Sequence, residues 1–201
     1  ADNAGTLALD SNFGATATGA ADATDLTTIY GQTSATINAT GVTGINGSAA
    51  NVHTVIDHAQ VNHDTNFTVT ISGTSAAAAD LKAINTITSG IITATGVETI
   101  TGSLSDVGDV VDVDTSKGNA GQQIDIDTDF NVTLSDTGTM SASALNTLNG
   151  KVPGTVTVTA AVTLTGSASD IATAASADNA GTLALDSNFG ATATGAADAT
   201  D

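Results

Sequence analysis

The chain has 201 residues with 21 acidic and three basic side chains, no Cys, and a formal net charge of −18. Three lysines cannot neutralise a nucleic-acid backbone, and the lack of Cys excludes disulfide scaffolds and thiolate metal sites. The sequence contains no run of about 18 apolar residues. We therefore expect neither a nucleic-acid partner nor insertion into a membrane.

The same 25 residues stand at both ends of the chain, in residues 1–25 and again in residues 177–201. The offset of 176 residues predicts a segment of a longer tandem array. We assign residues 1–17 to the end of one copy, residues 18–193 to one full period and residues 194–201 to the start of the next copy.

A shorter motif divides the period into six units. It consists of an Asp or Asn followed by two aliphatic residues three positions apart, as in Asp80, Leu81 and Ile84. A Ser stands three positions before the Asp or Asn in three units, which is the pattern of a helix N-cap; these residues are Ser48, Ser103 and Ser167. We therefore predict one short helical turn in each unit. The units span residues 18–45, 46–71, 72–100, 101–134, 135–164 and 165–193.

The second half of each unit has the alternation of a β-strand. In the run from Thr155 to Thr159, Val156 and Val158 share one face and the threonines share the other. We predict an all-β fold with short helical turns, namely a β-solenoid of about six coils of about 29 residues in each 176-residue period. A globular β-sandwich is the alternative.

Stacked coils would bury two ladders of aliphatic side chains, because no unit can bury its own apolar face. The first ladder would contain Leu26, Val52, Leu81, Val107, Leu145 and Ile171. The second would contain Ile45, Ile71, Ile100, Leu134 and Leu164.

The longest unit is rich in aspartate, and clustered carboxylates suit calcium. Asp112 begins a segment like an EF-hand loop, but the Gly comes one place late and Gln123 replaces the bidentate Glu. Two interpretations stay open: a looser calcium site, or a solvated acidic face that keeps strands from associating laterally. The departures from the EF-hand pattern favour the acidic face. The candidate calcium ligands are Asp109, Asp112, Asp114, Asp125 and Asp127; no other cofactor is expected.

Three histidines, His53, His58 and His63, are five residues apart. This spacing spreads side chains over different faces of a helix and alternates them on a strand, so we do not expect a zinc site. The chain contains no G-x-S-x-G, P-loop, G-x-G-x-x-G or H-E-x-x-H motif. We therefore expect that the protein is not an enzyme.

The run from Ser143 to Thr159, with its continuation from Leu164 to Ala174, resembles a known class of repeat. It is similar to the Ala/Thr/Gly/Asp-rich tandem repeats of giant secreted bacterial cell-surface proteins, many of them cyanobacterial, which are described as hemolysin-type or adhesin-like. The G-G-x-G-x-D nonapeptide of calcium β-rolls is absent.

This resemblance implies an extracellular protein at the cell surface with a structural, self-associating role. The implied partners are further copies of the chain, through axial stacking and lateral bundling. We expect a filament, sheath or matrix fibre; the alternative is the stalk of a giant adhesin, possibly stabilised by calcium.

Overall fold

A computed structural model describes residues 9–114 and 123–195, and within them six α-helices alternate with fourteen β-strands. Helix accounts for 31% and strand for 35% of the chain, so the predicted all-β solenoid is wrong and the fold is mixed α/β. The helices are α1 (Ala23–Tyr30), α2 (Ala49–Ile56), α3 (Ala78–Ile87), α4 (Leu104–Asp112), α5 (Ala142–Asn149) and α6 (Ala168–Ala180).

The strands form three sheets in which all pairs are parallel. The first sheet has the order β1 (Ala15–Asp22), β2 (Ile37–Gly47), β4 (Thr68–Ile71), β6 (Ile92–Ala94) and β8 (Ile124–Ile126), with β3 (Val61–His63) also paired to β2. The second has the order β5 (Ser75–Ala77), β7 (Thr99–Gly102), β9 (Asn131–Leu134), β11 (Val156–Val158) and β13 (Leu183–Ala184). The third has the order β10 (Gly138–Ser141), β12 (Val162–Gly166) and β14 (Gly190–Ala193).

Helices connect these strands because neighbouring parallel strands need a crossover connection. The predicted N-caps are confirmed: the Oγ atoms of Ser48, Ser103 and Ser167 accept backbone N–H groups at 3.2, 3.1 and 3.0 Å. The prediction failed in the length of the helices, which is eight to thirteen residues instead of one turn. Ala, Leu and Asp follow the caps, and apolar side chains three apart, such as Leu81 and Ile84, are buried and sustain further turns.

Short and long units alternate along the chain. A short unit places two strand positions between helices, and its next helix begins 26 residues after its own (23 to 49, 78 to 104 and 142 to 168). A long unit has three strands, as in β3, β4 and β5 after α2, or β8, β9 and β10 after α4. The third strand of a long unit, β5 or β10, is the first strand of a new sheet. The sheets are therefore staggered along the molecule.

A four-residue motif, Asp-Ser/Thr-Asn/Asp-Phe, occurs at residues 64–67 and 127–130 in the long units and at residues 10–13 and 186–189 in the duplicated segment. Phe67 and Phe130 are both 1% exposed and belong to the core. The motif places one large aromatic ring immediately before a strand in a chain whose other core residues are mostly small.

The first predicted ladder lies in the core, except that Ile171 is only partly buried. The residues of the second ladder are buried, but they are not one another's neighbours in the sheets. Ile45 pairs with Val69, and Leu164 pairs with Met140. The reason is the third strand of each long unit, which moves the following strands into a different sheet.

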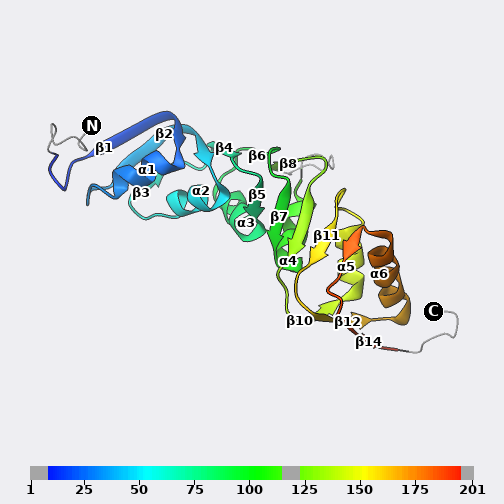
Figure 1. Cartoon of the computed structure of the whole chain (residues 1–201). Coiled ribbons are helices and arrows are strands. Elements are labelled where there is room, and N and C mark those ends of the chain that lie inside the picture. Colours follow the sequence, from blue (N-terminus) through cyan, green and yellow to red (C-terminus); the bar gives the residue numbers. More distant parts are fainter. Residues whose placement is uncertain (1–8, 115–122, 196–201) are drawn as a thin grey trace.

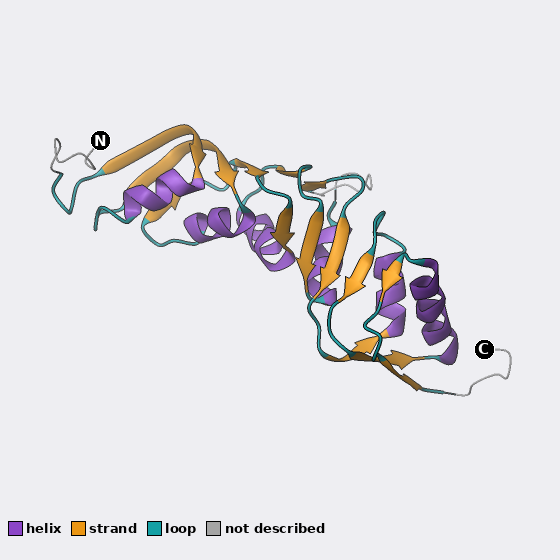
Figure 2. Cartoon of the chain, viewed as in Figure 1, coloured by secondary structure: helices purple, strands orange, loops and turns teal. Residues whose placement is uncertain are grey.

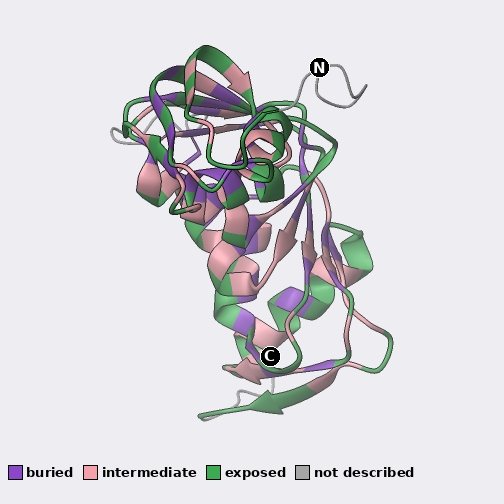
Figure 3. Cartoon of the chain, turned by 90° about the vertical axis from the view of Figure 1, so that its left-hand side faces the viewer, coloured by how far each residue is buried: buried purple, intermediate pink, exposed green. Residues whose placement is uncertain are grey.

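The molecule is elongated, and its elements follow one another from the N-terminal to the C-terminal end in chain order (Figure 1). The helices stack in one layer against the strands, and consecutive helices are in contact (Figure 2). Buried residues line the sides of helices and strands that face each other, and exposed residues cover the rest (Figure 3).

Candidate functional site

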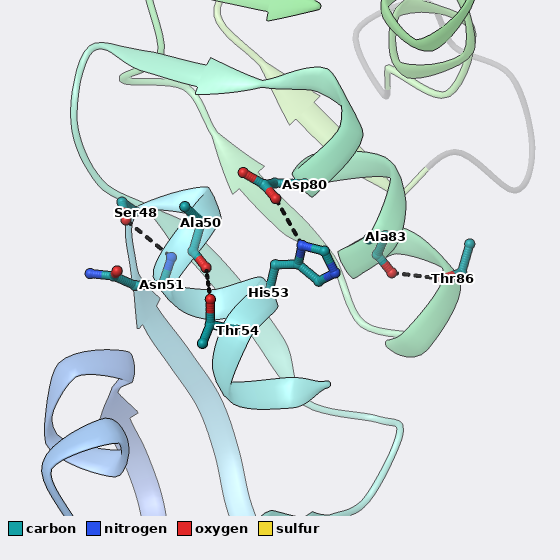
Figure 4. A network of polar contacts seen from close by, with 8 residues as sticks. All are labelled: Ser48, Ala50, Asn51, His53, Thr54, Asp80, Ala83 and Thr86. Carbon is teal, nitrogen blue, oxygen red and sulfur yellow. Dashed lines mark hydrogen bonds and ion pairs between the residues drawn. The ribbon is translucent and has the colours of Figure 1, made fainter. Parts of the chain in front are cut away.

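A row of polar contacts joins successive helices. The fifth residue of one helix contacts the third residue of the next: His53 of α2 lies 2.8 Å from a carboxylate oxygen of Asp80 on α3 (Figure 4). Asn146 of α5 repeats the arrangement by donating from Nδ2 to the carbonyl oxygen of Asp170 on α6, at 2.9 Å. These contacts fix the register of the helix layer.

Lys82 makes the same contact between α3 and α4. Its ammonium group lies 3.0 Å from Asp106 and 2.7 Å from Asp109. The hydrogen bond from Lys82 lowers the pKa of Asp106 below its usual value, and the bond from Ser103 adds to this effect. Asp109 and Asp106 in turn raise the pKa of Lys82. All three groups are partly exposed, so this ion-pair network orients the helices more than it stabilises them.

The junction between α4 and α5 lacks this contact because both positions hold small residues, Gly108 and Ala144. A cavity of about 590 Å³ opens there, and both residues line it. Lys151 of α5 forms an ion pair with Asp112 of α4 across the same junction. The cavity lies where the longest unit separates two helices.

The structure distributes the five predicted calcium ligands over different elements. Asp109 and Asp112 lie on α4 and pair with Lys82 and Lys151. In residues 9–114 and 123–195, no group of three or more His, Asp or Glu side chains is placed to hold a metal ion. The calcium site stays a prediction, and residues 115–122 of the same unit lie outside the described part of the chain.

The other three ligands have local structural roles. Asp114 is 1% exposed, bridges to Ile124, and accepts the N–H of Ile126 at 3.3 Å, so it covers the edge of β8. Asp125 lies on β8, with Thr93 of β6 as its neighbour in the sheet. Asp127 begins the motif before Phe130 and forms a hydrogen bond with Asp129, and this bond, with the repulsion between the two charges, raises the pKa of Asp129.

The three histidines do not converge. His53 contacts Asp80, and His58 stacks on Tyr30 with ring centroids 4.0 Å apart. His63 contacts the carbonyl oxygen of Ile56 through Nε2 at 2.8 Å.

The duplicated segment forms an outer strand at each end of the described structure. Near the N-terminus, β1 pairs with β2, with Ala15 opposite Ile37. Near the C-terminus, β14 pairs with β12, with Leu164 opposite Ala191. The repeated letters were visible in the sequence, but their use as two outer strands depends on the sheet order, which we did not foresee.

No protein-family model, no curated protein and no solved structure matches the chain. In the part of the chain that the structure describes, none of the helices combines the length and the apolar character needed to cross a membrane.

Proposed function

We propose that this protein is a structural repeat segment of an extracellular filament, sheath or matrix fibre on a bacterial cell surface. The observation that carries the proposal is the duplicated segment. The same residues begin and end a period of 176 residues, and they form the outermost strands of the first and third sheets. Such a chain extends by adding further copies along one axis.

The surface supports this role. Of the 21 acidic side chains, few meet a cation, because the chain has three lysines, and Lys82 and Lys151 both pair with α4. The remaining negative charge keeps neighbouring molecules hydrated and apart until ions screen it. Threonines such as Thr70 and Thr163 occupy the outward positions of strands, where they tolerate water and suit the extended backbone.

Immunogold labelling of intact, unpermeabilised cells that produce the protein tests the proposal. Antibodies raised against the 201-residue chain should label fibres or a sheath outside the cell. A preimmune serum is the matched control. Labelling that requires permeabilised cells would contradict the proposal.

A further inference from the structure

We propose that β14 of one period is also the strand β1 of the next, so that the third sheet of one copy and part of the first sheet of the following copy are a single sheet. The occupant of the free edge of β1 is thus β12 of the preceding copy. This inference rests on the proposed function, because it requires that copies follow one another in an array.

The two copies of the segment have the same local conformation. In the first, the backbone N–H of Asn12 donates to the Asp10 carboxylate at 3.0 Å, and in the second, Asn188 donates to Asp186 at 2.8 Å. The next residue, Phe13 or Phe189, closes the same turn with a backbone bond of 3.1 or 3.0 Å. The segment therefore folds in one way although its neighbours differ at the two ends.

The two copies use opposite edges. Residues 190–193 bind β12, whereas the identical residues 14–17 provide the strand that binds β2. Together, the two pairings define a strand with a parallel partner on each side. The combined register places Leu164 of one copy, the shared alanine (Ala15 or Ala191) and Ile37 of the next copy in one row.

The faces of this combined sheet also agree. Leu164 and Ile37 are both buried, so the shared alanine lies in an inward row between them. The next row contains Thr165, the shared threonine and Asn38, which all carry polar side chains and face outward. A shift of one residue would have placed an apolar row against a polar one.

The number of strands supplies independent support. The second sheet has five strands, whereas the third has three. The first sheet carries an additional parallel group in which the start of β1 pairs with the start of β2, and β2 with β3. If β14 and the start of β1 are one strand, the combined order β10-β12-β14/β1-β2-β3 has five strands, as in the second sheet.

The aromatic residue of the segment agrees with this arrangement. Phe67 and Phe130 are each 1% exposed and have strands of a preceding and a following unit beside them. Phe13 and Phe189 precede β1 and β14, which each have a partner on one side only, and both rings are partly buried. A shared strand would give this ring neighbours on both sides.

Disulfide cross-linking in a two-period protein tests the shared strand. The 201-residue chain is continued after Asp201 by a second copy of residues 26–201. Cysteines replace Thr192 in the first copy and Asn38 in the second, and the chain has no native Cys. Adjacent parallel strands are about 4.8 Å apart, which is within the Cα separation that a disulfide requires.

We expect this pair to oxidise as completely as Thr16→Cys with Asn38→Cys in the 201-residue chain, where those residues are paired neighbours. Closure should not depend on protein concentration. The off-register control is Thr192→Cys with Thr40→Cys of the second copy, two residues or about 7 Å farther along the strand. We expect much slower closure for this pair.

A first pair that stays reduced while the control in the 201-residue chain closes would overturn the inference, and so would equal closure of the off-register pair. Amide hydrogen exchange checks the result without cysteines: residues 190–193 should exchange at least about tenfold more slowly in the two-period protein than in the 201-residue chain. Unchanged exchange would also count against the shared strand. Neither measurement concerns the location of the protein, so surface labelling with a failed cross-link would leave the proposed function standing and reject only the shared sheet.

Discussion

At the scale of single residues, Asp129 is the side chain whose environment differs most from its counterparts in the repeated motif. The other motifs have Asn at this position, and Asn188 lies with Nδ2 3.2 Å from the Asp186 carboxylate. Asp129 faces Asp127 with a second carboxyl group, which can donate a hydrogen bond only when protonated. For this reason its pKa is raised.

We predict that Asp129→Asn stabilises the protein at about pH 7 and has little effect at about pH 3. A raised pKa in the folded state means that the stabilising contribution of Asp129 is present below the ordinary value of 3.8 and is lost as pH rises through the folded-state value. The amide donates at every pH, so it keeps the bond to Asp127. Thermal unfolding of both proteins across this pH range measures the difference.

Asp57→Asn is the matched control for this prediction, because it removes the same charge from an exposed position at the end of α2. If the two variants gain equal stability at about pH 7, the effect is a general relief of negative charge and the interaction of Asp129 with Asp127 is not its cause.

At the scale of an element, α4 and the strand before it contain two glycines with opposite requirements. Gly108 lies inside α4, and a Cβ there would meet no atom within 4 Å. Gly102 has φ +154°, and a Cβ would lie 3.2 Å from the Cβ of Ala78 at the start of α3. The equivalent glycines of the other short units, Gly47 and Gly166, have φ +158° and +152°.

We predict that Gly108→Ala raises the free energy of unfolding by about 0.5–1 kcal/mol, because alanine lowers the backbone entropy of the unfolded chain and favours helix. Gly102→Ala should lower it by about 1–3 kcal/mol, because alanine must adopt a disfavoured φ. Urea denaturation of both variants measures the two changes. Changes of the same sign would contradict the roles assigned to these glycines.

The N-cap of α4 allows a second test at this scale. Ser103→Ala removes the acceptor for the N–H of Asp106, and we expect a loss of about 1 kcal/mol in the free energy of unfolding. Ser105→Ala, two residues later on an exposed position of the same helix, is the control and should have no such effect. Equal losses in urea denaturation would show that the cap does not stabilise α4.

At the scale of the whole molecule, repulsion among acidic groups outweighs attraction. With 21 acidic and three basic side chains, most charged pairs repel, and the ion pairs of Lys82 and Lys151 are few and partly exposed. We predict that the melting temperature rises between about 0.01 and 1 M NaCl, because salt screens the repulsion. Differential scanning calorimetry measures the change, and a falling melting temperature would mean that the ion pairs dominate.

Divalent ions at matched ionic strength separate screening from specific binding. Screening predicts similar effects of MgCl₂ and CaCl₂. An additional rise with CaCl₂ that Asp109→Asn and Asp112→Asn remove would support the predicted calcium site, because calcium needs several oxygen ligands at once.

The sequence was sufficient for local features and insufficient for their assembly. Ser103 and Asp106 formed the predicted cap because this pairing depends on residues three positions apart. The strand around Val156 and Val158 followed from its alternation. In contrast, the single helical turn was wrong, because the helices continue through Ala-rich and Asp-rich residues that also suit loops.

The order of the sheets could not be derived from the six units, because we treated them as equivalent. The signal for two kinds of unit was present in the Asp-Ser/Thr-Asn/Asp-Phe motif, which marks long units at Phe67 and Phe130. The candidate calcium ligands, such as Asp114, were chosen by nearness in sequence. The fold separated them, because an acid at the end of a helix and an acid on a strand face different neighbours.

The alternation of short and long units also restricts how such a gene can change in length. Deleting one unit would bring together two of the same kind, and a strand would then face a neighbour from the wrong sheet. Deleting a short unit with its adjacent long unit would preserve every partnership. Recombination that retains a folded product should therefore add or remove units in pairs, and whole periods of three pairs satisfy this condition automatically.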